Sequence, residues 1–415
     1  MPGTTRFADL SDEHVAAVLA RLPLRDAARA RLVCKRWRAL ATGHVFLLRA
    51  CASATASRRA AAGFFFNDPF RFRAAYFPFP LGFSDAADED APAAAAADLS
   101  FLLPNTSPSA ASPPGGGGGI GNANVHVTSS CNGLLLVCIP PLPRRTEHYY
   151  VCNPLTREVA PIPALDLELL HGFNLAFDPA TSPHYKVVAF GAWYDIHVFS
   201  SETRSWGRKP IRPWRRRLLG LRSLRAVFWN GSMVWTLGHA LIRLVLGSER
   251  LTRIPMPPRI KKKRGWICAY IGESGGHLQM IGYTKEEKLT ACFEILEMQS
   301  DLSKWSVLYQ VDLGRVKELY PEIEWPTWDT RQLEHKVIDH LAISPVCVVR
   351  GSEEAGRQGL LIFSIPGKIM SYDMEDQRVS LIQEVMSSPG GDRGPYTLEH
   401  PWHYFYAYSP SLFTV

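Results

Sequence analysis

Residues 129–163 read SSCNGLLLVCIPPLPRRTEHYYVCNPLTREVAPIP, and this stretch decides the fold. It contains the apolar runs Gly133–Cys138, Tyr149–Asn153 and Val159–Pro163, divided by segments that contain Pro, Thr and charged residues. Short apolar runs bounded by turn-forming residues are typical of antiparallel strands. Together with the preceding residues from Val125, the stretch predicts one compact β-unit.

The same plan returns four more times along the chain. The further repeats are Phe173–Ile211, Ala226–Pro257, Trp266–Asp312 and Val337–Val385. Self-similarity at a period of roughly 40–50 residues is the signature of units too thin to be stable alone. Packing such units radially gives each one two neighbours and leaves only short edges. The sequence therefore predicts an all-β propeller of about six blades, with a pair of β-sandwiches as the alternative.

The sixth blade is expected from both chain ends. Aromatic residues within 60–82, among them Phe64–Phe66 and Tyr76–Phe79, have strand chemistry, as do Tyr404–Tyr408 and Leu412–Val415. Pairing these two sets closes the ring. Residues 85–122 hold long tracts of Ala, Pro and Gly. Such a composition buries too little apolar surface to offset the entropy of ordering, so this low-complexity segment is predicted to be a flexible loop.

The first fifty residues read as three helices. Ser11 is a candidate N-cap, Pro23 ends the first helix, the second runs from Asp26 to Leu32, and Gly43 stops the third. The apolar face of the first helix comprises Val15, Val18, Leu19 and Leu22, and that of the third comprises Val33, Trp37, Leu40 and Ala41. About 40 residues bury little of their surface on their own. We therefore expect this module to pack its apolar face against a partner.

The runs Leu10–Asp26 and Leu32–Trp37 resemble the F-box, with Ser11 at a position where that family usually has Pro. The resemblance implies that this face packs on a Skp-type adaptor, which links to a cullin scaffold. The alternative is a helical cap on the propeller with no outside partner. The adaptor-binding residues that the resemblance implies are Leu10, Val18, Leu19, Leu22, Pro23, Val33, Cys34, Lys35 and Trp37.

The first β-repeat resembles the associated domain of plant F-box proteins, which is related to Kelch-type propellers. The resemblance is carried by Ser130–Leu135 and Cys152–Arg157, followed by Pro161–Pro163. The expected organisation is an F-box over residues 5–50, the aromatic strands and the loop over 51–123, and the propeller over 124–415. The two resemblances together imply the substrate-recognition subunit of an SCF-type cullin-RING E3 ubiquitin ligase, non-catalytic and without a cofactor.

Composition limits the other classes of function. Lys and Arg exceed Asp and Glu by 46 to 39, a mild excess that favours acidic partners. We see no signal peptide and no run long enough to span a bilayer, and the eight cysteines have no C-x-x-C spacing. These features predict a cytoplasmic or nuclear protein with no membrane partner and free thiols.

Patterns that elsewhere carry catalysis or metal binding are not expected to do so here. Gly272–Gly276 fits G-x-S-x-G around Ser274, but it joins two strand-like runs, whereas a nucleophile elbow joins a strand to a helix. The pairs His335 with His340 and His400 with His403 lack the partner ligands of a zinc site.

Two basic clusters remain between the predicted blades. They are Arg215, Arg216 and Arg217, and Lys261, Lys262, Lys263 and Arg264. We interpret them either as solvated loops or as a nuclear-import or acidic-partner patch. The rival functions are a non-ligase propeller that binds glycan or nucleic acid, and a propeller enzyme with a helical leader. The expected target is an unidentified protein, and we do not expect nucleic acid.

Overall fold

The computed structural model describes fourteen segments of the chain, which fall into two compact units. One unit comprises Met1–Pro210 with Ala407–Val415, and the other comprises Ile211–Tyr406. The described residues are 10–49, 62–68, 73–79, 99–102, 125–139, 148–165, 170–191, 195–210, 225–237, 240–257, 267–328, 336–351, 359–384 and 405–415.

The N-terminal module of the first unit consists of α1 (Asp12–Leu19), α2 (Leu24–Ala30) and α3 (Lys35–Thr42), and residues 44–49 are also helical. The predicted cap is present, because the Ser11 side chain accepts a hydrogen bond from the His14 N–H at 3.4 Å. The third helix begins later than predicted. Cys34 is its N-cap, and its sulfur accepts from the Trp37 N–H at 3.4 Å. Val33 therefore lies in the turn before the helix.

Two four-stranded antiparallel sheets follow in the first unit, each with its strands in chain order. They match the first two predicted repeats. The first sheet contains β3 (His126–Cys131), β4 (Leu134–Ile139), β5 (His148–Asn153) and β6 (Glu158–Pro161). The second contains β7 (Leu170–Ala176), β8 (Lys186–Gly191), β9 (Asp195–Ser200) and β10 (Ser205–Pro210).

A three-stranded sheet has the order β2-β1-β25, with β1 at Gly63–Asp68, β2 at Arg73–Pro78 and β25 at Phe405–Tyr408. All its residues except Phe405 and Tyr406 belong to the first unit. It joins aromatic strands from opposite ends of the sequence, whereas closure of the ring stays a prediction. Phe64 and Phe65 are fully buried, and the Phe65 ring meets the Tyr408 ring edge-on at 5.3 Å between centroids. Residues 412–415 are not a strand, contrary to expectation.

Side chains on the first strands connect neighbouring sheets of this unit. The Asn67 amide of β1 donates to the Val127 carbonyl at 2.7 Å and accepts from the Val127 N–H at 3.0 Å. The Ser129 hydroxyl of β3 accepts from the Leu175 N–H of β7 at 3.0 Å. The side chains of Asn67 and Ser129 thus supply hydrogen-bond partners to backbone groups of Val127 and Leu175, which would otherwise need water. Each sheet is thereby fixed to the next.

The segment predicted as a loop over 85–122 contains an ordered stretch. Leu99 is fully buried, and a 3₁₀ turn covers Ser100–Leu102. Leu99 is one apolar residue close to Ala, Pro and Gly tracts, so the composition of the segment does not reveal that it is buried. The rest of the predicted loop lies outside the described residues.

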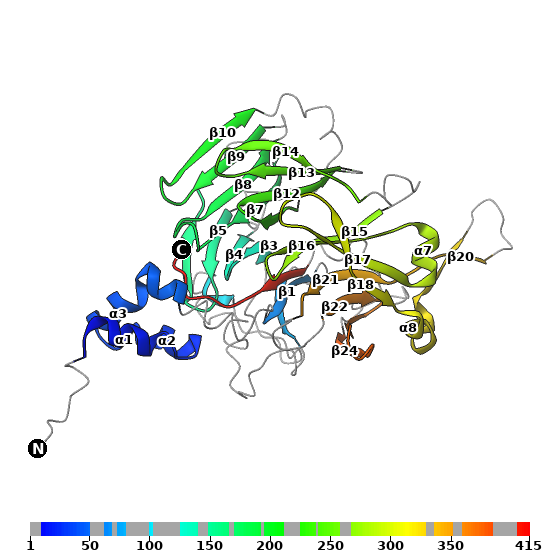
Figure 1. Ribbon diagram of the computed structural model, residues 1–415, viewed down its shortest axis with the longest axis horizontal. Coiled ribbons are helices and arrows are strands. Elements are labelled where there is room, and N and C mark those ends of the chain that lie inside the picture. Colours follow the sequence, from blue (N-terminus) through cyan, green and yellow to red (C-terminus); the bar gives the residue numbers. More distant parts are fainter. Residues whose placement is uncertain are drawn as a thin grey trace, which may run out of the picture. The chain divides into compact units, whose positions relative to one another are not determined.

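The second unit contains three further four-stranded sheets. One contains β11 (Val227–Trp229), β12 (Ser232–Leu237), β13 (Ala240–Val245) and β14 (Arg250–Ile254). The next contains β15 (Ile267–Ser274), β16 (His277–Tyr283), β17 (Cys292–Met298) and β18 (Trp305–Asp312). The last contains β21 (Ser344–Val349), β22 (Leu360–Ile365), β23 (Lys368–Asp373) and β24 (Val379–Glu384). The chain thus has a few N-terminal helices followed by the six blades of a β-propeller (Figure 1).

The fifth predicted repeat begins too early. β20 (Lys336–Leu341) pairs with β19 (Glu324–Trp328) in a separate two-stranded sheet, so the blade itself starts at Ser344. Leu341, Ala342 and Ile343 are all buried. The apolar pattern therefore runs across the boundary without marking it. The short helices α7 (Lys285–Thr290) and α8 (Gly314–Leu319) also lie in this unit.

Candidate functional site: the helical module and its anchor

The helical module exposes large aliphatic side chains around the turn between α2 and α3. Leu32 is 86% exposed and Val33 63%, and Val18 on α1 is 43% exposed. Pro23, Cys34 and Lys35 are exposed as well. Exposed aliphatic groups are common on folded proteins, so binding of a partner at these positions stays a prediction. We name Val18, Pro23, Leu32 and Val33 the docking surface.

The other predicted adaptor-binding residues are less accessible. Leu10, Leu22 and Trp37 are half-buried. Leu19 is only 1% exposed and belongs to the core of the module with Val15 and others. Contact with an adaptor stays a prediction for the whole set.

Polar contacts hold the start of α3 against the start of α1. Arg36 Nε lies 2.8 Å from Asp12 Oδ1, and Arg36 Nη2 donates to the Leu10 carbonyl at 2.5 Å. Both side chains of the ion pair are solvent-accessible, so the pair contributes under about 1 kcal/mol to stability. Its consequence is geometric, because it fixes the turn that carries Leu32 and Val33.

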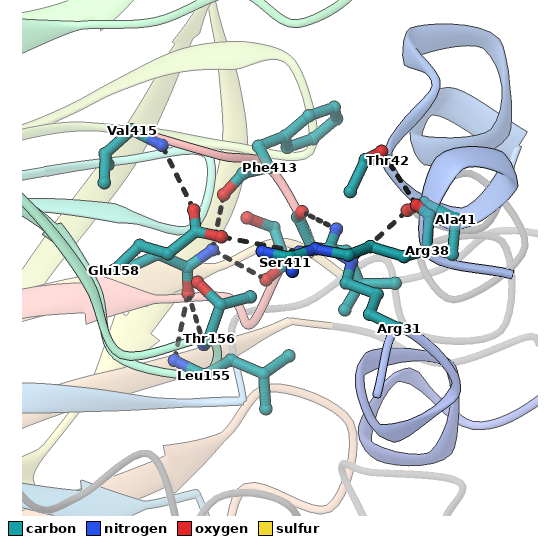
Figure 2. Close-up of polar contacts among 12 residues, drawn as sticks. Arg31, Arg38, Ala41, Thr42, Leu155, Thr156, Glu158, Ser411, Phe413 and Val415 are labelled. Carbon is teal, nitrogen blue, oxygen red and sulfur yellow. Dashed lines mark hydrogen bonds and ion pairs between the residues drawn. The ribbon is translucent and has the colours of Figure 1, made fainter. Parts of the chain in front are cut away.

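A buried arginine anchors the module to the rest of the first unit (Figure 2). Arg31 is 8% exposed and lies in the turn after α2. Its Nε donates to the Ala41 carbonyl of α3 at 3.3 Å, and its Nη2 donates to the Leu412 carbonyl at 2.5 Å. Its Nη1 lies 3.8 Å from Glu158 Oε1 of β6. One side chain thus joins α3, the first blade and residues 411–415.

Asn153 of the first blade also binds residues 411–415. It is fully buried at the end of β5, and its Nδ2 donates to the carbonyls of Ser411 at 2.9 Å and Phe413 at 2.7 Å. The Val415 N–H lies 3.4 Å from Glu158 Oε2. In Figure 1 the C-terminal end accordingly lies beside α3 and β5. No motif in the sequence marks Arg31, Asn153 or Glu158 as part of a site.

Of the catalytic and metal-binding patterns, the structure describes the segment around Ser274, whereas His335, His400 and His403 lie outside the described residues. Ser274 pairs with His277 across a two-residue hairpin turn, in which Gly275 and Gly276 both have positive φ. Its hydroxyl accepts a hydrogen bond from the Arg350 N–H at 2.9 Å. Within the described segments, no cluster of three or more His, Cys, Asp or Glu is placed to hold a metal ion.

The basic clusters predicted as a nuclear-import or acidic-partner patch fall outside the described residues, since 211–224 and 258–266 are not described. The described cysteines are free thiols. A search of the described helices for one that is both long and apolar enough to cross a membrane finds none.

Comparison with known proteins identifies the helical module. Residues 7–49 match the F-box domain. The chain is 25% identical to F-box protein At5g07610 of Arabidopsis thaliana over 401 residues, which cover 90% of this chain and 85% of the relative. It is 27% identical to F-box protein At5g49610 of the same plant over 220 residues, covering 48% of this chain and 59% of the relative.

Among solved structures, TolB from Acinetobacter baumannii overlaps 63% of this chain and 55% of its own at 11% identity, with a TM-score of 0.34. That overlap is too small to bear on function. The chain therefore carries an N-terminal F-box domain, followed by propeller blades, and is similar to plant F-box proteins.

Proposed function

We propose that this chain is the substrate-recognition subunit of an SCF-type cullin-RING E3 ubiquitin ligase. In this proposal the F-box docks a Skp-type adaptor, and the propeller holds a protein target for ubiquitination. The observation that carries it is the F-box match over residues 7–49 together with the exposure of Leu32 and Val33 on that same domain. Burying apolar surface gains roughly 25 cal/mol per Å², so these side chains are suited to the centre of an interface.

The chain itself performs no covalent step in this proposal. The adaptor and the cullin bring a ubiquitin-charged enzyme close to the target, and proximity converts a bimolecular transfer into an effectively unimolecular one. The location we propose is the cytoplasm, the nucleus or both, with the Arg215–Arg217 and Lys261–Arg264 clusters as candidate import signals.

Adaptor capture by the full chain tests the proposal. Replacing Leu32 and Val33 by Asp places charge on the docking surface at two side chains that are mostly exposed. We expect the Kd for a purified Skp-type adaptor to rise at least about tenfold, as for an interface hot spot. Leu319→Asp is the matched control, since Leu319 is 64% exposed on α8 in the other unit.

Unchanged capture by the Leu32→Asp, Val33→Asp variant, with an unchanged unfolding temperature, would contradict the proposed docking surface. Absence of capture by the unmodified chain would contradict the ligase function altogether. That second outcome would favour the rival classes, a glycan- or nucleic-acid-binding propeller or a propeller enzyme. Binding to nucleic acid would then show a steep dependence on salt.

A further inference from the structure

Residues 411–415 form no strand, yet three of them are buried. Ser411 is 4% exposed, Leu412 0% and Phe413 4%. We call residues 411–415 the strap. The Phe413 ring meets the Phe177 ring edge-on at 5.3 Å, and Phe177 directly follows β7 of the second blade. The strap therefore packs against the first two blades by its side chains.

The strap meets the F-box through its backbone. The carbonyls of Ser411 and Phe413 accept from Asn153, and the Leu412 carbonyl between them accepts from Arg31 (Figure 2). Successive carbonyls thus bond to the blade, to the F-box and again to the blade. A rigid guanidinium fork that also reaches Ala41 and Glu158 fixes direction as well as distance.

A second contact restricts rotation about this point. The His44 Nε2 lies 2.9 Å from the Pro179 carbonyl in the turn after β7. Arg31 thus holds the F-box to the first blade, and His44 holds it to the second. One attachment leaves the module free to pivot in every direction, whereas two separated attachments leave only rotation about the line that joins them.

We propose that Arg31 and the strap form a clasp that holds the F-box in one orientation against the first two blades. The effect of this clasp on ubiquitin transfer rests on the function proposed above. A held target then lies at a set distance and angle from the adaptor. Arg31 is a positioning residue, and it acts without touching the adaptor or the target.

The distance between two spin labels in the full chain tests the clasp. One label is placed at Glu13→Cys on α1 and the other at Glu202→Cys in the turn between β9 and β10, and both positions are exposed. The exposed Cys34 and Cys292, and Cys51, are replaced by Ser. Pulsed electron paramagnetic resonance should give a single narrow distance distribution.

Arg31→Met removes the bonds of the guanidinium and keeps most of the length of the side chain. We expect the distribution to broaden at least twofold, while adaptor affinity changes less than twofold. Arg38→Met, at an exposed position on α3, is the matched control and should leave the distribution narrow. An unchanged width in the Arg31→Met chain would overturn the proposal.

If Arg31→Met unfolds the helices, a second variant, Glu158→Arg, still tests the proposal. Glu158→Arg changes no residue of the F-box and places a like charge opposite Arg31. Broadening with retained helicity supports the clasp, and an unchanged width overturns it. Adaptor affinity of the unlabelled parent chain is measured separately. Its absence would count against the ligase function and leave the distance result standing.

Discussion

The side-chain amide of Asn153 donates a 2.7 Å hydrogen bond to the carbonyl of Phe413, 260 positions further along the chain. The same nitrogen donates to Ser411, while the amide oxygen accepts from the N–H groups of Leu155 at 2.9 Å and Thr156 at 3.3 Å. An amide offers two donors and two lone pairs, so every hydrogen-bonding position of this buried group is used. A single side chain therefore joins the first blade to the strap.

Asn153→Asp should lower the free energy of unfolding by about 3 kcal/mol or more. The change replaces two N–H donors by an oxygen facing two carbonyls, which leaves buried polar atoms unpaired at about 1–3 kcal/mol each. Asn230→Asp is the control, because Asn230 is exposed in a hairpin turn at φ 45°, a conformation that Asp also accepts. Urea unfolding measures both. Equal effects at the two positions would contradict the role given to Asn153.

Gly133→Ala should destabilise the protein more than Gly231→Ala. Both glycines have positive φ, +85° and +63°, so both replacements incur about 1–2 kcal/mol of backbone strain. A Cβ at Gly133 would overlap the Ser411 side chain and lie 2.9 Å from the Ser409 carbonyl, whereas Gly231 has nothing within 4 Å. We expect a further loss of about 1–3 kcal/mol at Gly133. Thermal unfolding that shifts equally for both would show that residues 409–411 do not pack on this turn.

Buried His197 predicts a loss of stability in mild acid. It is 6% exposed on β9, and burial lowers its pKa below 6.5, an effect that Asp195 opposes and Arg208 reinforces. The folded state keeps the ring neutral, while the unfolded chain binds a proton as the pH falls below 6.5. The contribution of this group to stability is therefore full above that pH and decreases toward the lowered folded pKa.

His197→Gln should flatten the dependence of unfolding free energy on pH between about pH 7.5 and about pH 5.5, even if the variant is less stable at every pH. His184→Gln, at an exposed position, should keep the slope of the parent protein. Parallel slopes for the parent and His197→Gln would exclude His197 as the source.

The local patterns predicted N-terminal helices followed by propeller blades, although the second helix spans Leu24–Ala30 and not Asp26–Leu32. Ser11 does cap α1, and the runs around Gly133–Cys138 and Tyr149–Asn153 do form strands of the first blade. These elements follow from turn residues and apolar periodicity, which act over a few positions. The start of the fifth blade was wrong because residues 341–343 are as apolar as the strands on either side of them.

The anchor could not be predicted in the same way. Arg31 is one of several arginines in a helical stretch, and its partners Ala41, Glu158 and Leu412 lie 10, 127 and 381 positions away. Nothing in its neighbours marks it as buried. Asn153 belongs to a run that carried the family resemblance, but that resemblance did not indicate what the amide binds. Such contacts depend on distant segments meeting, and only the fold brings them together.

Tyr408 offers a test of closure by the two ends of the sequence. Its ring is fully buried in β25, 5.3 Å from the Phe65 ring and 6.2 Å from the Tyr76 ring, and its carbonyl accepts from the Ala62 N–H at 2.9 Å. Truncation of a buried aromatic side chain costs about 3–5 kcal/mol, so Tyr408→Ala should lower the unfolding temperature by several degrees. Ala407→Ser, at the neighbouring exposed position, should change it little.

A chain that ends at Pro401 removes β25 and the strap together. We expect it to be less stable than Tyr408→Ala, because it also exposes the inner faces of β1 and the first blade and leaves the edge of β1 unpaired. Soluble yield and thermal unfolding measure the effect. Cooperative unfolding of this shortened chain at the temperature of the parent would show that the strands near Phe65 form a complete blade without β25. Closure by both ends would then be wrong.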